Sequence, residues 1–220
     1  MVNRIFLLLL IIFLGSCAPT RFVKPLAKKQ QAVNLSLGGP LISLNNISVP
    51  VPFLSATYGY GLDSNLTGFA GLNLTSVLYG NLQAELGITK GLIKPHGNLP
   101  GVSITPVANI IYRKNAGIKI FPQLDANAWW EFNRHRNILY AGISNWFELS
   151  GTKASGVSQK DHWLITPMVG HTFLRKKSEF TIELKIIAPQ LNNDKVAVDY
   201  KTPFGIHGAF GIYFGYTRKF

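Results

Sequence analysis

Long stretches of this chain alternate apolar residues with polar or small ones at a period of two. The segment 179–186 is the clearest example, with Phe180, Ile182, Leu184 and Ile186 alternating with Glu179, Thr181, Glu183 and Lys185. Because successive side chains of a strand point to opposite faces, this pattern predicts β-strands with one apolar and one polar face. Apolar residues at helical spacing, uninterrupted by Gly or Pro, are almost absent. The pattern therefore predicts an all-β chain.

Ten such segments follow one another, separated by turn residues such as those at 63–65, 114–117 and 176–178. The predicted strands are 31–38, 52–61, 66–77, 80–90, 101–113, 116–130, 137–149, 161–175, 178–189 and 205–219. Several exceed the usual length of a globular strand and match the roughly 9–11 residues that a tilted strand needs to cross a bilayer. We expect a closed antiparallel up-and-down transmembrane β-barrel of about 10 strands, with 8 or 12 as alternatives.

Alternation alone does not say which face is outside. The charged strand residues share a face with Gly, Ala, Ser and Thr, which suits a narrow lumen. Aromatic residues gather near predicted strand ends, as in the aromatic belts of membrane barrels: Tyr58 and Tyr60, Trp129 and Trp130, Trp146 and Phe147, Trp163, and residues 213–216. Both features favour lipid outside. The alternative is a soluble periplasmic lipoprotein with a β-sandwich or a lipocalin-like cup.

The chain begins with a short basic start and an apolar run over residues 5–14, followed by Gly15, Ser16 and the only Cys, Cys17. Ten apolar residues suit a signal peptide and are too few for a membrane-spanning helix. The string 14–17 resembles the lipobox of bacterial lipoproteins. That resemblance implies a signal peptide over 1–16, a diacylglycerol and palmitate on Cys17, and recognition by the lipoprotein-sorting machinery. Ala18 in place of an acidic residue implies sorting to the outer membrane.

Residues 17–30 show no periodicity and are predicted to be a lipidated tether, with the barrel over 31–220. The last strand alternates aromatic and small residues and ends the chain on Phe220. It resembles the final strand of Gram-negative outer-membrane β-barrels, which implies that Phe220 is a signal for the barrel-insertion machinery. The third position from the end, often Tyr or apolar in that family, is Arg218.

An even strand count places both ends of the barrel domain on one side. If Cys17 is anchored on the periplasmic side, the turns near 62–65, 91–100, 133–136 and 175–178 are periplasmic. Segments 39–51, 150–160 and 190–204 then become long external loops. The net charge of +12 gathers at the periplasmic turns and not along a groove or helix. We therefore expect contacts with anionic lipid headgroups of the outer membrane and no nucleic-acid partner.

The predicted lumen carries both signs of charge, in Glu85, Arg113, Lys119, Asp125, Glu183 and Lys185. A self-paired polar plug is favoured over an open channel, because lumens of barrels near eight strands are just filled by side chains. No phosphate loop, metal-ligand spacing, cofactor motif or nucleophile motif occurs, so no metal, cofactor or active site is expected. The expected role is structural, binding or limited transport. The alternative is an outer-surface barrel hydrolase of lipid or peptide, using Glu148, Asp161 and His162.

Overall fold

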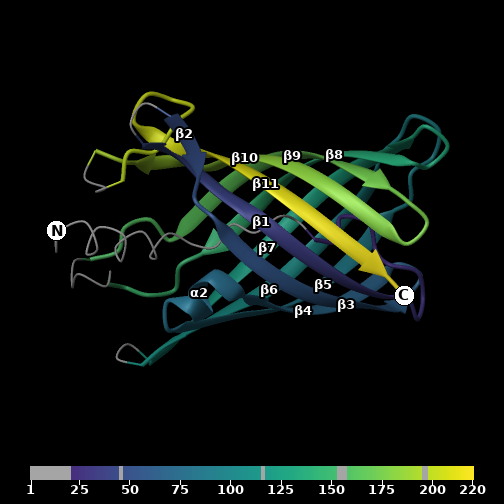
Figure 1. Ribbon diagram of the computed structural model, residues 1–220, viewed down its shortest axis with the longest axis horizontal. Coiled ribbons are helices and arrows are strands. Elements are labelled where there is room, and N and C mark those ends of the chain that lie inside the picture. Colours follow the sequence, from purple (N-terminus) through teal and green to yellow (C-terminus); the bar gives the residue numbers. More distant parts are fainter. Residues whose placement is uncertain (1–20, 45–46, 115–116, 153–157, 195–197) are drawn as a thin grey trace.

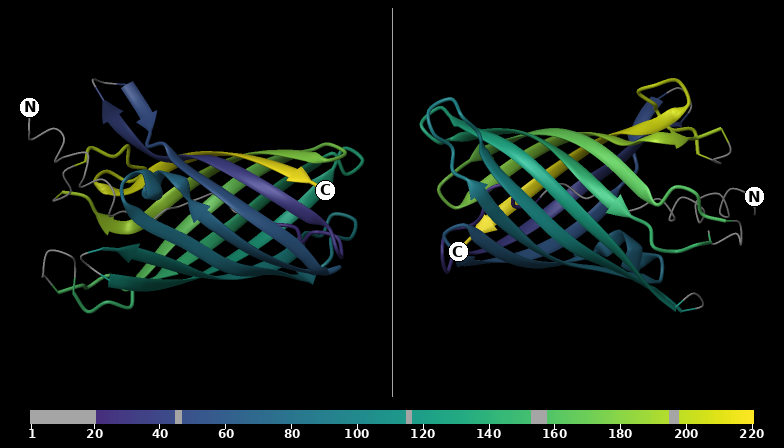
Figure 2. Two further views of the ribbon diagram at one scale, coloured as in Figure 1. Left: turned by 60° about the horizontal axis from the view of Figure 1, so that its bottom comes forward. Right: turned by 180° about the vertical axis from the view of Figure 1, so that it is seen from behind.

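The computed structural model describes residues 21–44, 47–114, 117–152, 158–194 and 198–220. Its sheet runs in chain order, with every strand antiparallel to its neighbour. The elements are β1 (Gln31–Leu44), β2 (Ile47–Pro50), β3 (Phe53–Asp63), β4 (Leu66–Asn73), α2 (Leu74–Leu78), β5 (Asn81–Ile93), β6 (Gly101–Arg113), β7 (Gly117–Phe132), β8 (Asn137–Phe147), β9 (Trp163–Leu174), β10 (Ser178–Asn192) and β11 (His207–Lys219). Figures 1 and 2 show the strands tilted around a common axis.

The sheet closes on itself because β11 pairs with β1, in a register that runs from Ala32↔Lys219 to Pro40↔Gly211. The short β2 pairs only with the far end of β1, so ten of the described strands form the wall. Closure leaves no strand edge between the first and last strands of the wall, which a lipid environment demands because unsatisfied backbone groups there cost several kcal/mol each. The predicted closed ten-stranded barrel is confirmed.

The two faces of the wall have opposite polarity. On β5 the side chains of Leu82, Leu86 and Ile88 are exposed, whereas Gln83 and Glu85 are buried. The same inversion recurs along the other strands, where the buried residues are mostly Ser, Thr, Asn, Gln and a few charged groups. An apolar exterior around a polar interior is the arrangement that a bilayer stabilises and water does not. It contradicts the soluble sandwich or cup, whose polarity would be the reverse.

The connections at the two ends differ in length. Residues 64–65, 94–100, 133–136 and 175–177 make one end, the turn end, where the C-terminus lies (Figure 1, right). The opposite, long-loop end carries the β1–β2 hairpin, α2 and the described residues 148–152, 158–162, 193–194 and 198–206. The backbone N–H of Phe220 donates to the carbonyl of Gln31 at 2.9 Å, so the first residue of β1 lies beside the end of β11. This is the predicted partition of turns and loops.

Two boundaries differ from the sequence expectation. Much of the expected loop 39–51 is a hairpin in which Leu41–Leu44 pairs with Ile47–Pro50; apolar alternation continues there past the Gly38-Gly39 step. The expected strand 66–77 ends at Asn73, whose side chain accepts a hydrogen bond from the Ser76 N–H at 2.9 Å. Asn73 is therefore the N-cap of α2, which is about one and a half turns long.

The aromatic residues divide between the two faces. Tyr58 and Trp163 are exposed on the outside, as a belt requires. Trp129 and Tyr213 are buried instead, on the lumen face, which corrects the expectation that they belong to the belt. No helix among the described residues is long and apolar enough to span a membrane.

Candidate functional site

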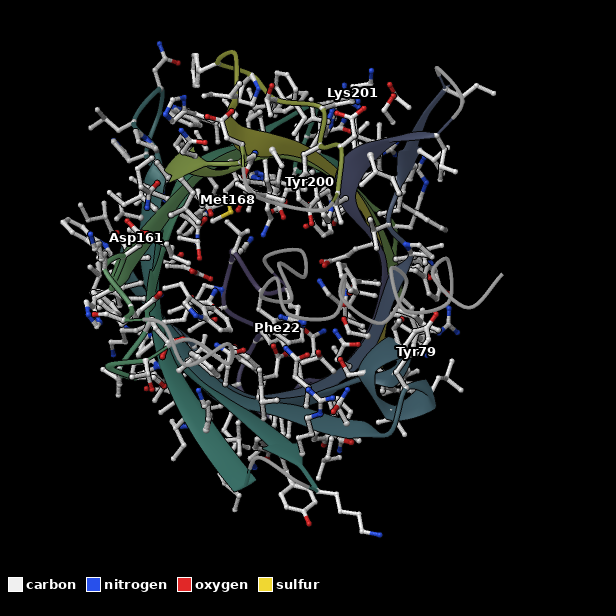
Figure 3. All side chains as sticks on the ribbon, turned by 90° about the vertical axis from the view of Figure 1, so that its left-hand side faces the viewer. Phe22, Tyr79, Asp161, Met168, Tyr200 and Lys201 are labelled. Atoms are coloured by element: carbon white, nitrogen blue, oxygen red, sulfur yellow. The ribbon has the colours of Figure 1, made fainter. Side chains whose placement is uncertain are left out.

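Residues 21–30, hereafter the lumen segment, enter the barrel from the turn end: Phe22, Val23 and Leu26 are buried in it, whereas Lys24 and residues 27–29 are exposed. Looking along the axis from the long-loop end, Phe22 lies within the ring of strands (Figure 3). The segment is pinned by main-chain bonds: Lys29 N–H donates to the Gly61 carbonyl at 2.8 Å, and Gly61 N–H to the Gln30 carbonyl at 2.9 Å. Leu26 N–H donates to Thr67 Oγ1 at 2.7 Å. From residue 21 onward, the stretch expected to be a tether is therefore an ordered part of the lumen.

Apolar side chains of the lumen segment pack against opposite walls. Phe22 contacts Phe69 of β4, with ring centroids 6.0 Å apart. Val23 joins a buried cluster with Trp129 of β7 and Tyr140 of β8, and its carbonyl accepts from the Ser103 hydroxyl of β6 at 2.7 Å. Contacts from β4 to β8 mean that the segment crosses the lumen near the turn end.

Small residues on the inner wall make room for it. A Cβ on Gly59 would lie 2.5 Å from the Phe22 ring, and one on Gly61 would lie 1.9 Å from the Ala27 carbonyl oxygen. Real Cβ atoms essentially never come so close, so the absent side chains of β3 provide the space that the lumen segment fills. A ten-stranded barrel is wide enough to need such filling.

One charged cluster joins the segment to the wall. The Arg21 guanidinium lies 2.9 Å from the Glu85 carboxylate and 3.3 Å from the Ser55 hydroxyl. Glu85 also accepts from Thr57 Oγ1 at 3.1 Å. Both charged side chains are about nine-tenths buried, so each charge depends on the other for compensation.

A second ionic contact lies at the turn end. The Lys24 ammonium and the His135 ring each lie 2.6 Å from Glu131 near the end of β7. Lys28 and Asp63 form a looser exposed pair at 3.7 Å. The lumen segment is thus tied by charge to β5, β7 and β3.

The opposite half of the lumen holds a cluster centred on Glu183. Tyr140 donates a hydrogen bond to this carboxylate at 2.7 Å, and the Lys185 ammonium lies 3.1 Å from it. The same ammonium lies 5.2 Å from the centre of the Tyr213 ring, a cation–π contact. Glu183 and Tyr213 are fully buried and Lys185 nearly so.

Asp125 belongs to a hydrogen-bond network whose other members are uncharged side chains. Gln123 donates to Asp125 at 2.8 Å and contacts the Ser144 hydroxyl at 3.1 Å. Asn109 donates to the Gln123 side-chain oxygen at 3.0 Å. Three strands, β6 to β8, are therefore cross-linked through side chains inside the barrel.

The structure brings Glu85, Asp125, Glu183 and Lys185 into the lumen, as the alternation predicts. Arg113 lies exposed at the last residue of β6, and Lys119 is half-buried on the extended part of β7. β5 still pairs with β6 at Asn81↔Arg113, whereas β8 pairs with β7 only from Gln123 onward, so the β6–β7 hairpin extends past β8. Cys17 lies outside the described residues.

The residues of the hydrolase alternative lie at the long-loop end but are not assembled as a catalytic group. The His162 Nδ1 atom lies 2.8 Å from the backbone carbonyl of Glu148. Its hydrogen-bond partner is therefore this carbonyl and not the Glu148 carboxylate. That carboxylate accepts from the Ser150 N–H at 2.7 Å, and Asp161 lies at the rim (Figure 3). Within the described ranges, no three His, Cys, Asp or Glu residues gather as around a metal ion.

Sequence reasoning missed the lumen segment. Its signal is faint: Phe22, Val23 and Leu26 are apolar within a basic stretch that has no strand period. A stronger signal is the pair of glycines at inward positions of β3, Gly59 and Gly61, because an inner wall without side chains requires something else to fill it.

No protein-family model matches this sequence, and no curated protein matches it. Solved structures with similar architecture include an outer-membrane channel from Pseudomonas putida F1, with 10% identity, a TM-score of 0.49 and coverage of 90% of this chain and 98% of that one. The KdgM porin is similar at 9% identity and a TM-score of 0.41, covering 86% and 99%. At these identities and scores, they are likenesses of architecture and no function is transferred from them.

Proposed function

We propose that this chain is a bacterial outer-membrane β-barrel lipoprotein whose lumen is closed near the turn end by residues 21–30. Its role is structural, or binding and limited transport through its loops and lumen, and it is not an enzyme. The single observation that supports this most strongly is the lumen segment, held by apolar packing and by the Arg21–Glu85 ion pair across a barrel with an apolar exterior.

The polar lumen supports a plug better than a pore. Arg21 pairs with Glu85 and Lys185 with Glu183 at short distance, and many of the amides and hydroxyls bond to each other. Lumens of barrels near eight strands are just filled by side chains, whereas porins with sixteen to eighteen strands leave an aqueous channel. Ten strands together with an internal segment leave little continuous space for ions.

The proposed anchor is a lipid on Cys17. The string 14–17, which resembles a lipobox, supports it. Metabolic labelling with radioactive palmitate should mark the wild-type chain and not the Cys17→Ser variant; labelling of both would refute this site.

Phe220 is proposed as the recognition residue for barrel insertion. It is exposed at the end of β11, while its backbone continues the pairing with β1. Phe220→Ala should leave the register intact and reduce the amount of heat-modifiable barrel in membranes. An unchanged amount would remove Phe220 from this role.

The plug is tested by single-channel recording of the purified full chain in planar bilayers. The wild type should give no large stable conductance steps. The release variant Arg21→Ala/Phe22→Ala/Lys24→Ala removes contacts to β5, β4 and β7 and should give frequent steps. Lys28→Ala/Lys29→Ala, which changes exposed residues of the same segment, is the control and should behave as wild type. Large steady steps from the wild type would refute the plug.

A further inference from the structure

An open groove of about 860 Å³ lies at the turn end, outside the lumen contacts described above. It is formed where the β7–β8 and β9–β10 turns meet. Its lining residues are Asn133, His135, Arg136, Asn137, Phe173, Leu174, Arg175 and Lys176. No acidic residue is among them: four are His, Arg or Lys, two are apolar and two are Asn.

The backbone of the first turn is held in a conformation that side chains disfavour. Asn133, Arg134 and His135 have φ angles of 51°, 55° and 60°. Asn and His tolerate the left-handed region better than most residues, whereas Arg is rarely found there. Two hydrogen bonds support the turn: Arg136 N–H donates to the Asn133 carbonyl at 3.2 Å, and Leu174 N–H to the Arg136 carbonyl at 2.7 Å. The second bond fixes the two turns against each other, which sets the spacing of the groove's cations.

The cations of the groove are not balanced by nearby acid on its lining. Glu131, below the first turn, already contacts the ammonium of Lys24 and the ring of His135 at 2.6 Å each. Arg136, Arg175 and Lys176 are exposed. Arg175 Nη1 donates to the Leu174 carbonyl at 3.1 Å. The two guanidinium groups and the ammonium line one groove, and this set of donors suits a phosphate oxyanion.

The apolar side of the groove continues onto the lipid-facing wall. Phe173 stacks on His171 with ring centroids 4.3 Å apart, and Phe132 lies 5.6 Å from the same ring. The register places His171 opposite Leu139 and Ile182, both exposed on the outside. A ligand with an anionic head and an apolar tail would satisfy both sides at once, whereas a free phosphate would use only one.

We propose that this groove binds the anionic headgroup of a glycerophospholipid from the leaflet at the turn end, with its acyl chain along Phe173 and the adjoining outer wall. The proposal rests on the proposed placement in a membrane, and goes beyond it by naming a ligand class and a site. The site differs from a general basic rim because two turns fixed by a hydrogen bond present cations beside an aromatic surface.

The test is native mass spectrometry of the purified full chain in a neutral detergent, titrated with phosphatidylglycerol, phosphatidylcholine or inorganic phosphate. The groove variant is Arg136→Gln/Arg175→Gln/Lys176→Gln. The control is Lys114→Gln/Lys119→Gln/Lys201→Gln, which removes the same charge from the long-loop end. We expect the wild type and the control to bind phosphatidylglycerol in preference to phosphatidylcholine, and the groove variant to bind it at least about tenfold more weakly.

The proposal is overturned if the groove variant binds phosphatidylglycerol as tightly as wild type, if the control loses as much, or if inorganic phosphate competes as well as the lipid. A second measurement does not depend on variants: a photoactivatable phosphatidylglycerol should cross-link wild type at 133–137 or 173–176, and labelling elsewhere only would also overturn it. Failure of lipid binding in a heat-modifiable barrel refutes the groove alone, whereas a chain that is soluble without detergent refutes the membrane placement.

Discussion

Removing Arg21 should destabilise the barrel more than the loss of any exposed charge in the same segment. Arg21→Met keeps most of the side-chain volume but leaves the Glu85 carboxylate, about nine-tenths buried, without its cation. Thr57 supplies one hydrogen bond to that carboxylate, which does not replace a charge. The Ser55 hydroxyl loses its guanidinium contact as well.

The expected cost follows from the burial of the pair. Breaking a buried ion pair by removing one partner costs about 3–5 kcal/mol, because the remaining charge is uncompensated. We expect a loss at the lower end, about 3 kcal/mol, since water can enter the lumen where Met replaces the guanidinium. Arg21→Met/Glu85→Gln should recover at least half of this loss, because the introduced amide would still accept from Thr57 and carries no charge. Lys28→Met, which removes an exposed pair, should change stability far less, because solvent screens such a pair.

The assay is urea unfolding of each variant in lipid vesicles, followed by the fluorescence of the chain's four Trp residues and by heat-modifiable gel migration. Equal stability of Arg21→Met and Lys28→Met would refute the argument, since it would mean that Arg21 does not lie beside Glu85 in the folded barrel. A double variant as unstable as the single one would show that the loss comes from packing and not from the unpaired carboxylate.

Three further outcomes follow from the same structure. Gly170→Ala should destabilise the barrel by about 1–3 kcal/mol, because a Cβ there would lie 2.2 Å from the Tyr140 ring and push this ring from its hydrogen bond to Glu183. The loss is measured as a lower temperature of unfolding in heat-modifiable gel migration, and a wild-type temperature would argue against that packing. Leu86→Arg should cost about 2–4 kcal/mol in vesicles, since Leu86 faces lipid, and a neutral effect would place Leu86 outside the bilayer. Burial raises the pKa of Tyr200, in the β10–β11 loop, to about 12. Because the folded pKa lies above the unfolded one, the contribution of Tyr200 to stability is lost as the pH rises from about 10 to 12. The absorbance titration of wild type minus that of Tyr200→Phe should therefore show one phenol that titrates near pH 12 and not near 10.

The architecture could be predicted because alternation is a local property. The row Phe180, Ile182, Leu184 against Glu183 and Lys185 fixes which residues share a face, wherever the strand lies in the sheet. A polar row with small residues then indicates the lumen, and the even strand count fixes which connections share an end. The buried positions of Glu85, Asp125, Glu183 and Lys185 follow from this periodicity alone.

Other features depend on contacts between distant parts of the chain. Arg113 continues the polar row of β6, but periodicity does not say where the wall ends and the hairpin begins. The position of Trp129 near a strand end suggested the outer belt, although the period of two puts it on the face of Asp125 and Asn127. Its contact with Val23 shows what fills the lumen there. The ion pair of Arg21 and Glu85 joins residues far apart in the chain, and no local pattern predicts it.

The most direct test of a barrel whose lumen segment enters from the turn end is cysteine cross-linking in intact outer membranes. The Val23 carbonyl lies 2.7 Å from the Ser103 hydroxyl inside the wall, whereas the side chain of the adjacent Val102 points to the opposite, lipid-facing side of β6. Val23→Cys/Ser103→Cys should therefore form a bismaleimide cross-link that changes gel migration, and Val23→Cys/Val102→Cys should not. Absence of the first cross-link in a folded barrel, or equal yields for the two pairs, would contradict a lumen closed by its own N-terminal segment.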